Sequence, residues 1–286
     1  MRYPGTILRH HHLLARKELG QNFLADPRAA EMIVNRAEIS PSDIVLEIGA
    51  GLGALTIPVA QKAGQIFAVE KDARLAPVLK EELDRAGIEN AEVLNMDIFK
   101  VDFYALAGEK KLVVMGNLPY NISSQILIRL VEQRTCVKKA VFMLQKELAQ
   151  RITAKPGGKT YGRLSAVMQY SARIRSLADL GPQLFFPKPE VDSRVIEITF
   201  FEKTSLSREK EMFLYKVIKA AFSKRRKTLK NSLSGRELNI TPAQALSALS
   251  AAGIDPVKRA ETLHVSEFTG LSHVLWGICK TGGENG

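Results

Sequence analysis

Short apolar runs alternate with amphipathic stretches of helical period between residues 41 and 153, and this alternation constrains the fold more than any other feature of the chain. Such a rhythm is typical of a parallel sheet covered by helices. The predicted strands are Ile44–Ile48, Ile66–Glu70, Ala91–Asn95, Leu112–Gly116 and Ala140–Leu144, followed by Ser193–Phe201 near the sheet edge. The predicted helices are Ala54–Lys62, Ala73–Arg85, Ser123–Gln133 and Lys146–Thr153. We therefore expect an α/β domain.

After about Lys203 the apolar residues follow a helical period only. The segments with this period are Glu209–Ser223, Lys227–Leu233, Pro242–Ala252 and Ser266–Ile278. Thr241 and Pro242 suit the N-cap and the first position of a helix. We therefore expect a small all-helical domain over residues 204–286, after an α/β domain over residues 17–203.

Residues 1–16 form a basic leader that lacks the continuous apolar segment of a secretory signal, and we expect it to be flexible. Its histidines, His10, His11 and His12, are adjacent, which suits no common metal-ligand spacing, so we expect no metal site. No run of about 18 apolar residues occurs, so we expect no membrane span and no membrane partner. Cys136 and Cys279 lie far apart and outside any redox spacing, which favours a reducing compartment and therefore the cytoplasm.

The net charge of +11 points to a polyanionic partner, because cationic side chains on phosphates release condensed counterions. Seven basic residues and no acidic residue fall between positions 216 and 230, interleaved with apolar residues that suit a buried face. We expect this segment to bind RNA phosphates, with a second basic cluster around the mouth of the site. The expected RNA contacts are Lys224, Arg225, Arg226, Lys227 and Lys230, together with Lys146 and Arg163 from the second cluster.

A glycine-rich turn, Glu47-Ile-Gly49-Ala-Gly51-Leu-Gly53-Ala54, follows the first predicted strand. Glycine allows positive φ and close approach of the backbone to a ligand, so such a turn can hold a nucleotide at a helix N-terminus. Glu70 follows roughly 20 residues later, as in the dinucleotide-binding fingerprint. The turn alone does not separate a nicotinamide cofactor from S-adenosylmethionine.

Three acidic residues at the ends of predicted strands favour S-adenosylmethionine. Glu47 precedes the first glycine and suits the cationic methionine end of that cofactor. Glu70 ends the second strand, where its two oxygens can accept both ribose hydroxyls. Asp97 follows the third strand and can accept a hydrogen bond from the adenine amine. The carboxyl ends of parallel strands meet at one edge, so we expect one cofactor site there.

The segment Asn117-Leu118-Pro119-Tyr120 directly follows the fourth strand and suits a planar base that carries an amine. The Asn117 side-chain carbonyl and a backbone carbonyl can accept both amine hydrogens, and Tyr120 offers a ring for stacking. Accepting both hydrogens turns the nitrogen lone pair toward the methyl group. Positioning then supplies most of the catalysis, without a strong base.

These residues lie within a longer series of motifs that resembles the small-subunit ribosomal RNA adenine dimethyltransferases (the KsgA type). The matching segments extend over roughly residues 17–270, in the order of the family. They are Leu19-Gly-Gln-Asn-Phe-Leu24, Glu47-Ile-Gly-Ala-Gly51, Asn117-Leu-Pro-Tyr-Asn-Ile-Ser123, Phe142-Met-Leu-Gln-Lys-Glu147, Tyr161-Gly-Arg-Leu-Ser165, Phe186-Pro-Lys-Pro-Glu-Val-Asp-Ser193 and Ala221-Phe-Ser-Lys-Arg-Arg-Lys-Thr-Leu229.

The resemblance implies a Rossmann-like class I methyltransferase domain, with S-adenosylmethionine as cofactor, followed by a helical domain that binds RNA or the ribosome. It implies dimethylation of two adjacent adenines near the 3′ end of small-subunit (16S) ribosomal RNA, in the small subunit or its precursor. No DNA partner is expected, and the protein is expected to be a monomer. The cofactor contacts that it implies, with those expected above, are Gln21, Asn22, Leu24, Glu47, Gly49, Gly51, Glu70, Asp97 and Asn117, and the base contacts are Asn117, Leu118, Tyr120 and Phe186.

Three alternatives stay open. The first is a related dimethyltransferase of large-subunit RNA, against which Leu118 and the Phe186-Pro-Lys-Pro loop favour the small-subunit group. The second is a non-catalytic ribosome assembly factor on the same fold, which the intact acids and Asn117–Tyr120 disfavour. The third is a nicotinamide oxidoreductase, which lacks a candidate proton donor and leaves Asn117–Tyr120 unexplained.

Overall fold

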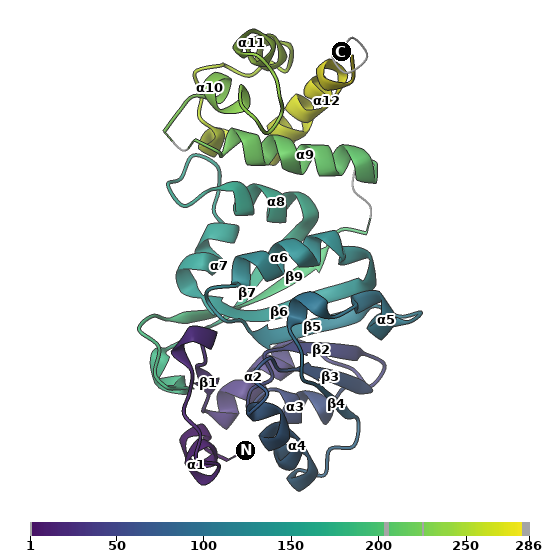
Figure 1. The fold of residues 1–286 in the computed structure, drawn as a ribbon, viewed down its shortest axis with the longest axis vertical. Coiled ribbons are helices and arrows are strands. Elements are labelled where there is room, and N and C mark those ends of the chain that lie inside the picture. The colour runs from purple at the N-terminus through teal and green to yellow at the C-terminus, as the bar shows by residue number, and fades with distance from the viewer. Residues whose placement is uncertain (1, 203–205, 225, 282–286) are drawn as a thin grey trace. The chain divides into compact units, whose positions relative to one another are not determined.

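The computed structural model describes residues 2–202, 206–224 and 226–281. The chain divides into two compact units (Figure 1). The first unit contains residues 1–149 and 173–202, and the second contains residues 150–172 and 203–286. The sequence-based boundary near residue 203 coincides with one of these borders. It did not foresee that residues 150–172 belong to the second unit.

The first unit contains a seven-stranded sheet with the order β4-β3-β2-β5-β6-β9-β7 (Figure 1). Four pairs of neighbours are parallel: β2 with β3, β2 with β5, β3 with β4, and β5 with β6. Strand β9 runs antiparallel to β6. The strands are β2 (Ile44–Ile48), β3 (Gln65–Val69), β4 (Ala91–Leu94), β5 (Leu112–Asn117), β6 (Val137–Gln145), β7 (Ala172–Leu180) and β9 (Ser193–Phe200). The predicted α/β class is confirmed.

Helices lie between successive parallel strands and flank the first and the last of them. They are α2 (Pro27–Arg36), α3 (Thr56–Ala60), α4 (Leu75–Arg85), α5 (Phe103–Ala107) and α6 (Ser123–Glu132), with α7 (Lys146–Ile152) after β6. Apolar side chains of the central strands, among them Val45, Val113 and Val141, are buried in one core with Ile33 and Val59 of the helices. The chain order reverses between β2 and β5, and ligands bind at the carboxyl ends of the strands at such a switch point.

The leader differs from the flexible segment expected over residues 1–16. Residues Pro4–His10 form helix α1, and Ile7 and Leu8 of this helix are buried. They pack with Phe23, Leu52, Leu75 and Val78 in one apolar cluster, defined here as the leader cluster. The leader has few apolar residues, but Pro4, Ile7 and Leu8 are buried on one face of helix α1, and Ile7 and Leu8 pack with residues far along the chain. Strands β1 (Phe23–Leu24) and β8 (Phe185–Phe186) form a separate antiparallel pair near this cluster.

The second unit is helical, as predicted for residues after 203. Its helices are α8 (Arg163–Ser171), α9 (Arg208–Ala221), α10 (Leu229–Leu233), α11 (Pro242–Ala251) and α12 (Val265–Thr281). Thr241 caps α11 by accepting from the Gln244 backbone N–H at 3.2 Å, and the Gln244 side chain accepts from the Thr241 N–H at 2.8 Å. The aromatic rings of Phe222 and Phe268 pack at 5.8 Å between centroids.

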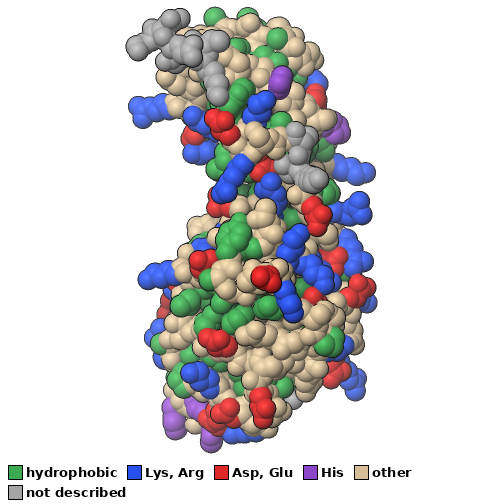
Figure 2. Space-filling view, turned by 90° about the vertical axis from the view of Figure 1, so that its right-hand side faces the viewer, with side chains coloured by type: hydrophobic (Ala, Val, Ile, Leu, Met, Phe, Trp, Pro, Cys, Tyr) green, Lys and Arg blue, Asp and Glu red, His purple; other side chains and the backbone are tan. Residues whose placement is uncertain are grey.

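On the face drawn in Figure 2, basic side chains are scattered over the surface, and many have acidic side chains nearby. Among the described residues, no helix combines the length and the apolar character that crossing a membrane requires.

Candidate active site

A cleft lies at the carboxyl ends of β2, β3 and β5 in the first unit. Its empty volume, open solvent at its mouth included, is about 1030 Å³. The lining comes from five stretches of chain and one residue of β6: residues 19–24, 47–52 with 54 and 55, 69–71, 96–98, 117 with 119, 121 and 122, and Met143. The cleft therefore forms at the switch point of the sheet, where the sequence places its acidic residues.

The glycine-rich turn forms one wall of this cleft. Gly49, Gly51 and Gly53 have φ values of 75°, 58° and 84°, which side-chain-bearing residues rarely adopt. A Cβ on Gly51 would lie only 3.1 Å from the Phe23 ring. The backbone N–H groups of Gly49 and Ala50 both donate to the Val69 carbonyl, at 2.9 and 3.1 Å. The turn is thus fixed against β3 with its backbone exposed to the cleft.

Glu70 ends β3 and holds the adjoining loops together. Its Oε2 accepts from the Gly51 N–H at 2.8 Å, and its Oε1 accepts from the Asp72 N–H at 2.7 Å. Its side chain is buried, and burial raises the pKa of the carboxyl. Each carboxylate oxygen has a further lone pair, so Glu70 can still accept from a ligand. The sequence did not reveal that both oxygens also bind backbone groups.

Glu47 is the most deeply buried acidic residue of the cleft, with 2% of its surface exposed. Burial, together with the nearby charge of Glu70, raises the pKa of Glu47 to about 8. Its Oε2 has no hydrogen-bond partner among the residues that the structure describes. A buried carboxylate oxygen without a partner is costly, and a cationic ligand in the cleft would stabilise the ionised form of Glu47.

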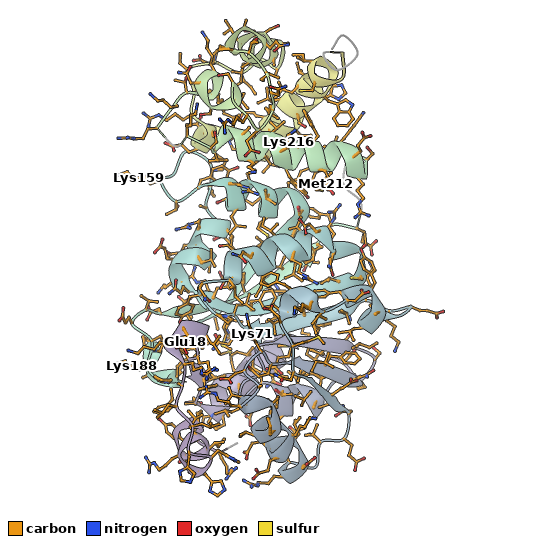
Figure 3. All side chains as sticks on the ribbon, viewed as in Figure 1. Glu18, Lys71, Lys159, Lys188, Met212 and Lys216 are labelled. Carbon is orange, nitrogen blue, oxygen red and sulfur yellow. The ribbon has the colours of Figure 1, made fainter. Side chains whose placement is uncertain are left out.

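Asp97 also lines the cleft and forms an ion pair with Lys71, whose Nζ is 2.8 Å from Asp97 Oδ2. The Lys71 ammonium holds the pKa of the Asp97 carboxyl below its usual value. Asp97 Oδ1 accepts from the Phe99 N–H at 3.0 Å. Lys71 follows β3 beside the cleft (Figure 3). The sequence analysis did not single out Lys71, although its position directly after Glu70 could have done so.

Gln21 contacts the loop after β3 through Asp72, a residue that the sequence analysis missed. Its Nε2 donates to Asp72 Oδ2 at 3.0 Å, and Arg74 donates to both oxygens of Asp72, at 2.9 and 2.6 Å. The Arg74 guanidinium holds the pKa of Asp72 far below its ordinary value. Gln21 Oε1 accepts from the Arg16 N–H at 2.8 Å. This chain of contacts connects the end of the leader to the cleft.

Asn117 stands at the end of β5 with its amide orientation fixed. Its Nδ2 donates to the Asn22 carbonyl at 2.7 Å, so its Oδ1 is the group that can accept from a ligand. The following turn is held by the Pro119 carbonyl, which accepts from Ser123 Oγ at 2.7 Å. A Cβ on Gly20, which has a φ of 65°, would lie 3.3 Å from Pro119 Cβ. The two motifs around Asn22 and Asn117 are therefore in close contact.

The structure brings the predicted cofactor residues together, since Gln21, Asn22, Leu24, Glu47, Gly49, Gly51, Glu70, Asp97 and Asn117 all line the cleft. The predicted base contacts are more dispersed. Leu118 is buried beside β6, where its N–H donates to Met143, and Tyr120 is half-buried outside the lining. Phe186 pairs with Phe23 in the β1–β8 ladder, and its ring packs on Tyr3 at 5.5 Å between centroids. Phe186 thus contacts the leader and does not line the cleft.

The expected RNA contacts differ in their surroundings. Lys224, Arg226 and Lys227 are exposed in the turn between α9 and α10, and Lys230 is half-buried. Arg225 lies outside the described residues. In the second cluster, Arg163 is exposed at the start of α8, whereas Lys146 forms ion pairs with Asp192 at 3.2 Å and Asp179 at 3.6 Å.

Comparisons with known proteins relate this chain to methyltransferases that act on ribosomal RNA. Residues 12–275 match the model of a family described as ribosomal RNA adenine dimethylase. The chain is 60% identical over 278 residues to ribosomal RNA small subunit methyltransferase A of Desulforapulum autotrophicum, covering 97% of this chain and 98% of that protein. It resembles a solved dimethyladenosine transferase from Plasmodium falciparum, with a TM-score of 0.77, 27% identity and coverage of 91% and 98% of the two chains. It also resembles the 23S rRNA methyltransferase ErmE, with a TM-score of 0.68, 25% identity and coverage of 88% and 99%.

Proposed function

Because this chain belongs to the ribosomal RNA adenine dimethylase family, we propose that it dimethylates two adjacent adenines near the 3′ end of small-subunit ribosomal RNA. S-adenosylmethionine would supply each methyl group as an electrophilic carbon on a sulfonium. The observation that carries the proposal is the fixed amide of Asn117 at the edge of a cleft lined with acids. We expect the enzyme in the cytoplasm with its ribosomal substrate.

We assign the cofactor to the cleft between the glycine-rich turn and Asp97. Glu70 would accept from the ribose hydroxyls with the lone pairs that Gly51 and Asp72 leave free. Glu47 would compensate the positive charge of the methionine end, which removes the cost of its own burial. Asp97, kept ionised by Lys71, would accept from the adenine amine.

We assign the target adenine to the mouth of the cleft at Asn117–Tyr120. Asn117 Oδ1 and the Leu118 carbonyl would each accept one hydrogen of the exocyclic amine. The nitrogen lone pair then points out of the plane of the base and attacks the methyl carbon, while the carbon–sulfur bond breaks and the amine proton leaves to solvent. Tyr120 would stack on the base, and Phe186 would make a second contact with it.

RNA would be held mainly through phosphates, by Lys224, Arg225, Arg226, Lys227 and Lys230 of the second unit, with Arg163 as an addition. We expect a weaker contribution from Lys146, because two carboxylates already compensate its charge. The adenine would be turned out of its RNA context into the cleft.

A large-subunit RNA substrate is the second candidate, because ErmE, a 23S rRNA methyltransferase, resembles this chain over most of its length. The small-subunit assignment is favoured because the 60% identical relative is named a small subunit methyltransferase. A role in assembly without catalysis is a third candidate on the same fold.

One experiment separates these candidates. The protein is incubated with labelled S-adenosylmethionine and either small or large ribosomal subunits that lack the modification, and the labelled nucleotides are mapped. We expect label on two adjacent adenines near the 3′ end of the small-subunit RNA. Label confined to large-subunit RNA would support the second candidate. Binding to small subunits without methyl transfer would support the assembly role.

A further inference from the structure

The turn after helix α1 brings two of the leader's histidines next to an acidic residue of α4. One ligand atom from each of His10, His11 and Glu81 lies within 4.8 Å of the other two. His11 Nε2 is 3.5 Å from Glu81 Oε2. Tetrahedral Zn²⁺ with bonds of about 2.0–2.1 Å to nitrogen and oxygen separates its ligand atoms by about 3.3 Å. Small side-chain rotations would therefore bring all three groups onto one ion.

His11 lacks an ordinary partner for its buried nitrogen. Nε2 of His11 is inaccessible to solvent and makes no hydrogen bond to any described residue. The approach of Glu81 at 3.5 Å is an electrostatic contact rather than a hydrogen bond. A buried polar atom without a partner is costly, and a metal ion between the imidazole and the carboxylate would satisfy both.

The backbone holds the two histidines in a defined turn. His12 has a φ of 54°, and the N–H groups of His12 and Leu13 donate to the carbonyls of Arg9 and Leu8, at 3.1 and 2.8 Å. This is the Schellman arrangement at the end of a helix, and Leu8 and Leu13 make the apolar contact that accompanies it. The rings of His10 and His11 meet edge to face at 5.0 Å between centroids. The pair is thus built into the fold, unlike histidines in a flexible tail.

Arg85 also orients the Glu81 side chain. Arg85 Nη2 donates to Glu81 Oε1 at 2.6 Å, which leaves Oε2 facing His11. Metal-binding carboxylates are commonly held by such outer contacts. Arg2 and Arg85 both contact Glu82, so local charges are balanced and an ion would bind through coordination rather than net attraction. Imidazole nitrogens with one carboxylate suit Zn²⁺ better than Mg²⁺ or Ca²⁺.

We propose that His10, His11 and Glu81 form a three-ligand Zn²⁺ site that fastens helix α1 to helix α4. We expected no metal site from the sequence because only the spacing of ligands within the leader was considered. The third ligand, Glu81, lies 70 positions after His11. Two of the three ligands precede residue 12, where the family match begins. Figure 2 shows histidine side chains, in purple, at the surface at the lower left of the view. His10 and Glu81 are exposed, which leaves access for a fourth ligand such as water.

The test uses the full chain without a histidine tag, stripped of metal, and titrated with Zn²⁺ in a calorimeter. We expect one ion per chain. His11→Asn and Glu81→Gln should each weaken binding by at least about tenfold, since even outer contacts of metal sites are worth that much. His12→Asn is the matched control: it removes an adjacent histidine outside the cluster, and asparagine tolerates its positive φ.

Thermal unfolding provides the second readout. Zn²⁺ should raise the Tm of the wild type and of His12→Asn, because a ligand that binds only the folded state stabilises it, but it should not raise the Tm of Glu81→Gln. Equal Tm values of the metal-free proteins would show that the variants fold. Unchanged Zn²⁺ affinity in Glu81→Gln would overturn the proposal. If His12→Asn weakened Zn²⁺ binding as much as His11→Asn, the proposal would also be overturned, because adjacent histidines would then bind Zn²⁺ independently of the folded arrangement with Glu81.

Discussion

In the cleft of the first unit, Glu47 and Glu70 are buried and Glu70 is held by backbone groups, whereas in the second unit the basic side chains between α9 and α10 are exposed around a turn. Glu70 accepts from two backbone N–H groups, at 2.8 and 2.7 Å. By comparison, the Lys224 ammonium donates to the Asn231 carbonyl over a longer distance of 3.4 Å. The first region suits a ligand of one shape, and the second suits a polyanion whose phosphates can be met in several ways.

The comparison predicts that substitutions in the two regions change different quantities. Changes in the cleft should alter the rate of methyl transfer or the affinity for the cofactor, because geometry is fixed there. Changes in the basic turn should alter the affinity for RNA and its dependence on salt, because counterion release dominates there.

The largest expected effect is that of Asn117→Ala, which removes the acceptor that orients the target amine. Positioning of reacting groups commonly supplies factors of about a hundred or more, so methyl transfer in a single turnover should slow by at least that factor. RNA affinity should not change. Gln125→Ala, an exposed substitution on the following helix, is the matched control and should keep the wild-type rate. A wild-type rate for Asn117→Ala would remove this residue from the proposed base site.

Glu70→Ala should act on the cofactor. It leaves the ribose hydroxyls without an acceptor, which costs about 1–3 kcal/mol, or about five- to 150-fold in affinity. Calorimetric titration with S-adenosylmethionine measures this. Glu92→Ala, on the exposed side of β4, should bind normally. Equal affinity of Glu70→Ala and Glu92→Ala would exclude Glu70 from the site.

Glu47 should make cofactor binding depend on pH. With its pKa raised from 4.5 to about 8, the carboxyl is protonated at pH 7, and a cationic ligand should displace the proton. Affinity should therefore rise with pH up to about 8, and up to one proton should be released on binding near pH 7. Glu47→Gln should release none. Calorimetry in buffers of different ionisation enthalpy counts these protons, and equal counts in both proteins would contradict this role.

The same raised pKa has a consequence for stability. The folded protein keeps a proton on Glu47 that the unfolded chain releases above pH 4.5, so this group's contribution to stability falls as the pH rises from 4.5 to about 8. Glu47→Gln should remove this fall. Denaturant unfolding at pH 5.5 and 8 would measure the difference, and an identical pH dependence in both proteins would contradict it.

The smallest effect on chemistry should come from the basic turn. Replacing Arg226 and Lys227 with Ala should weaken RNA binding and reduce the slope of its salt dependence by up to about 0.9 for each lost phosphate contact, a value taken from duplex DNA. Replacing Lys62 and Lys80, two exposed lysines of the first unit, removes the same charge and is the control. Equal salt slopes for the two double variants would mean that only net charge matters.

The sheet could be predicted from the sequence because its central strands are apolar along their whole length. Ile44–Ile48 agrees with β2 at both ends, and the other predicted strands differ from the observed ones by one to three residues. Strand β7 was missed because Arg173, Arg175 and Asp179 interrupt its apolar residues, so the segment reads as polar. Helix α1 was missed because its buried residues pack against distant parts of the chain, among them Leu75 and Val78 about 70 positions away.

The residue types that line the cleft at the strand ends could be predicted from the sequence, but the hydrogen bonds among them could not. The strand order brings Glu47, Glu70 and Asp97 to one edge, which follows from parallel topology. The contacts of Gln21 with Asp72 and of Asn117 with Asn22 join segments 51 and 95 positions apart, so no local pattern indicates them. For Phe186, the motif predicted a contact with the target base, whereas in the structure its ring packs on Tyr3 of the leader.

The central claim is that the cleft carries out the chemistry and the basic turn captures the RNA. Single-turnover methylation of unmodified small subunits, with cofactor saturating and enzyme raised to saturation, tests this most directly for Asn117→Ala and for the Arg226→Ala, Lys227→Ala double variant. The account predicts that the double variant reaches the wild-type rate once its weaker binding is overcome, and that Asn117→Ala stays at least about a hundredfold slower at any concentration. A wild-type rate for Asn117→Ala, or a double variant that stays slow at saturation, would contradict it.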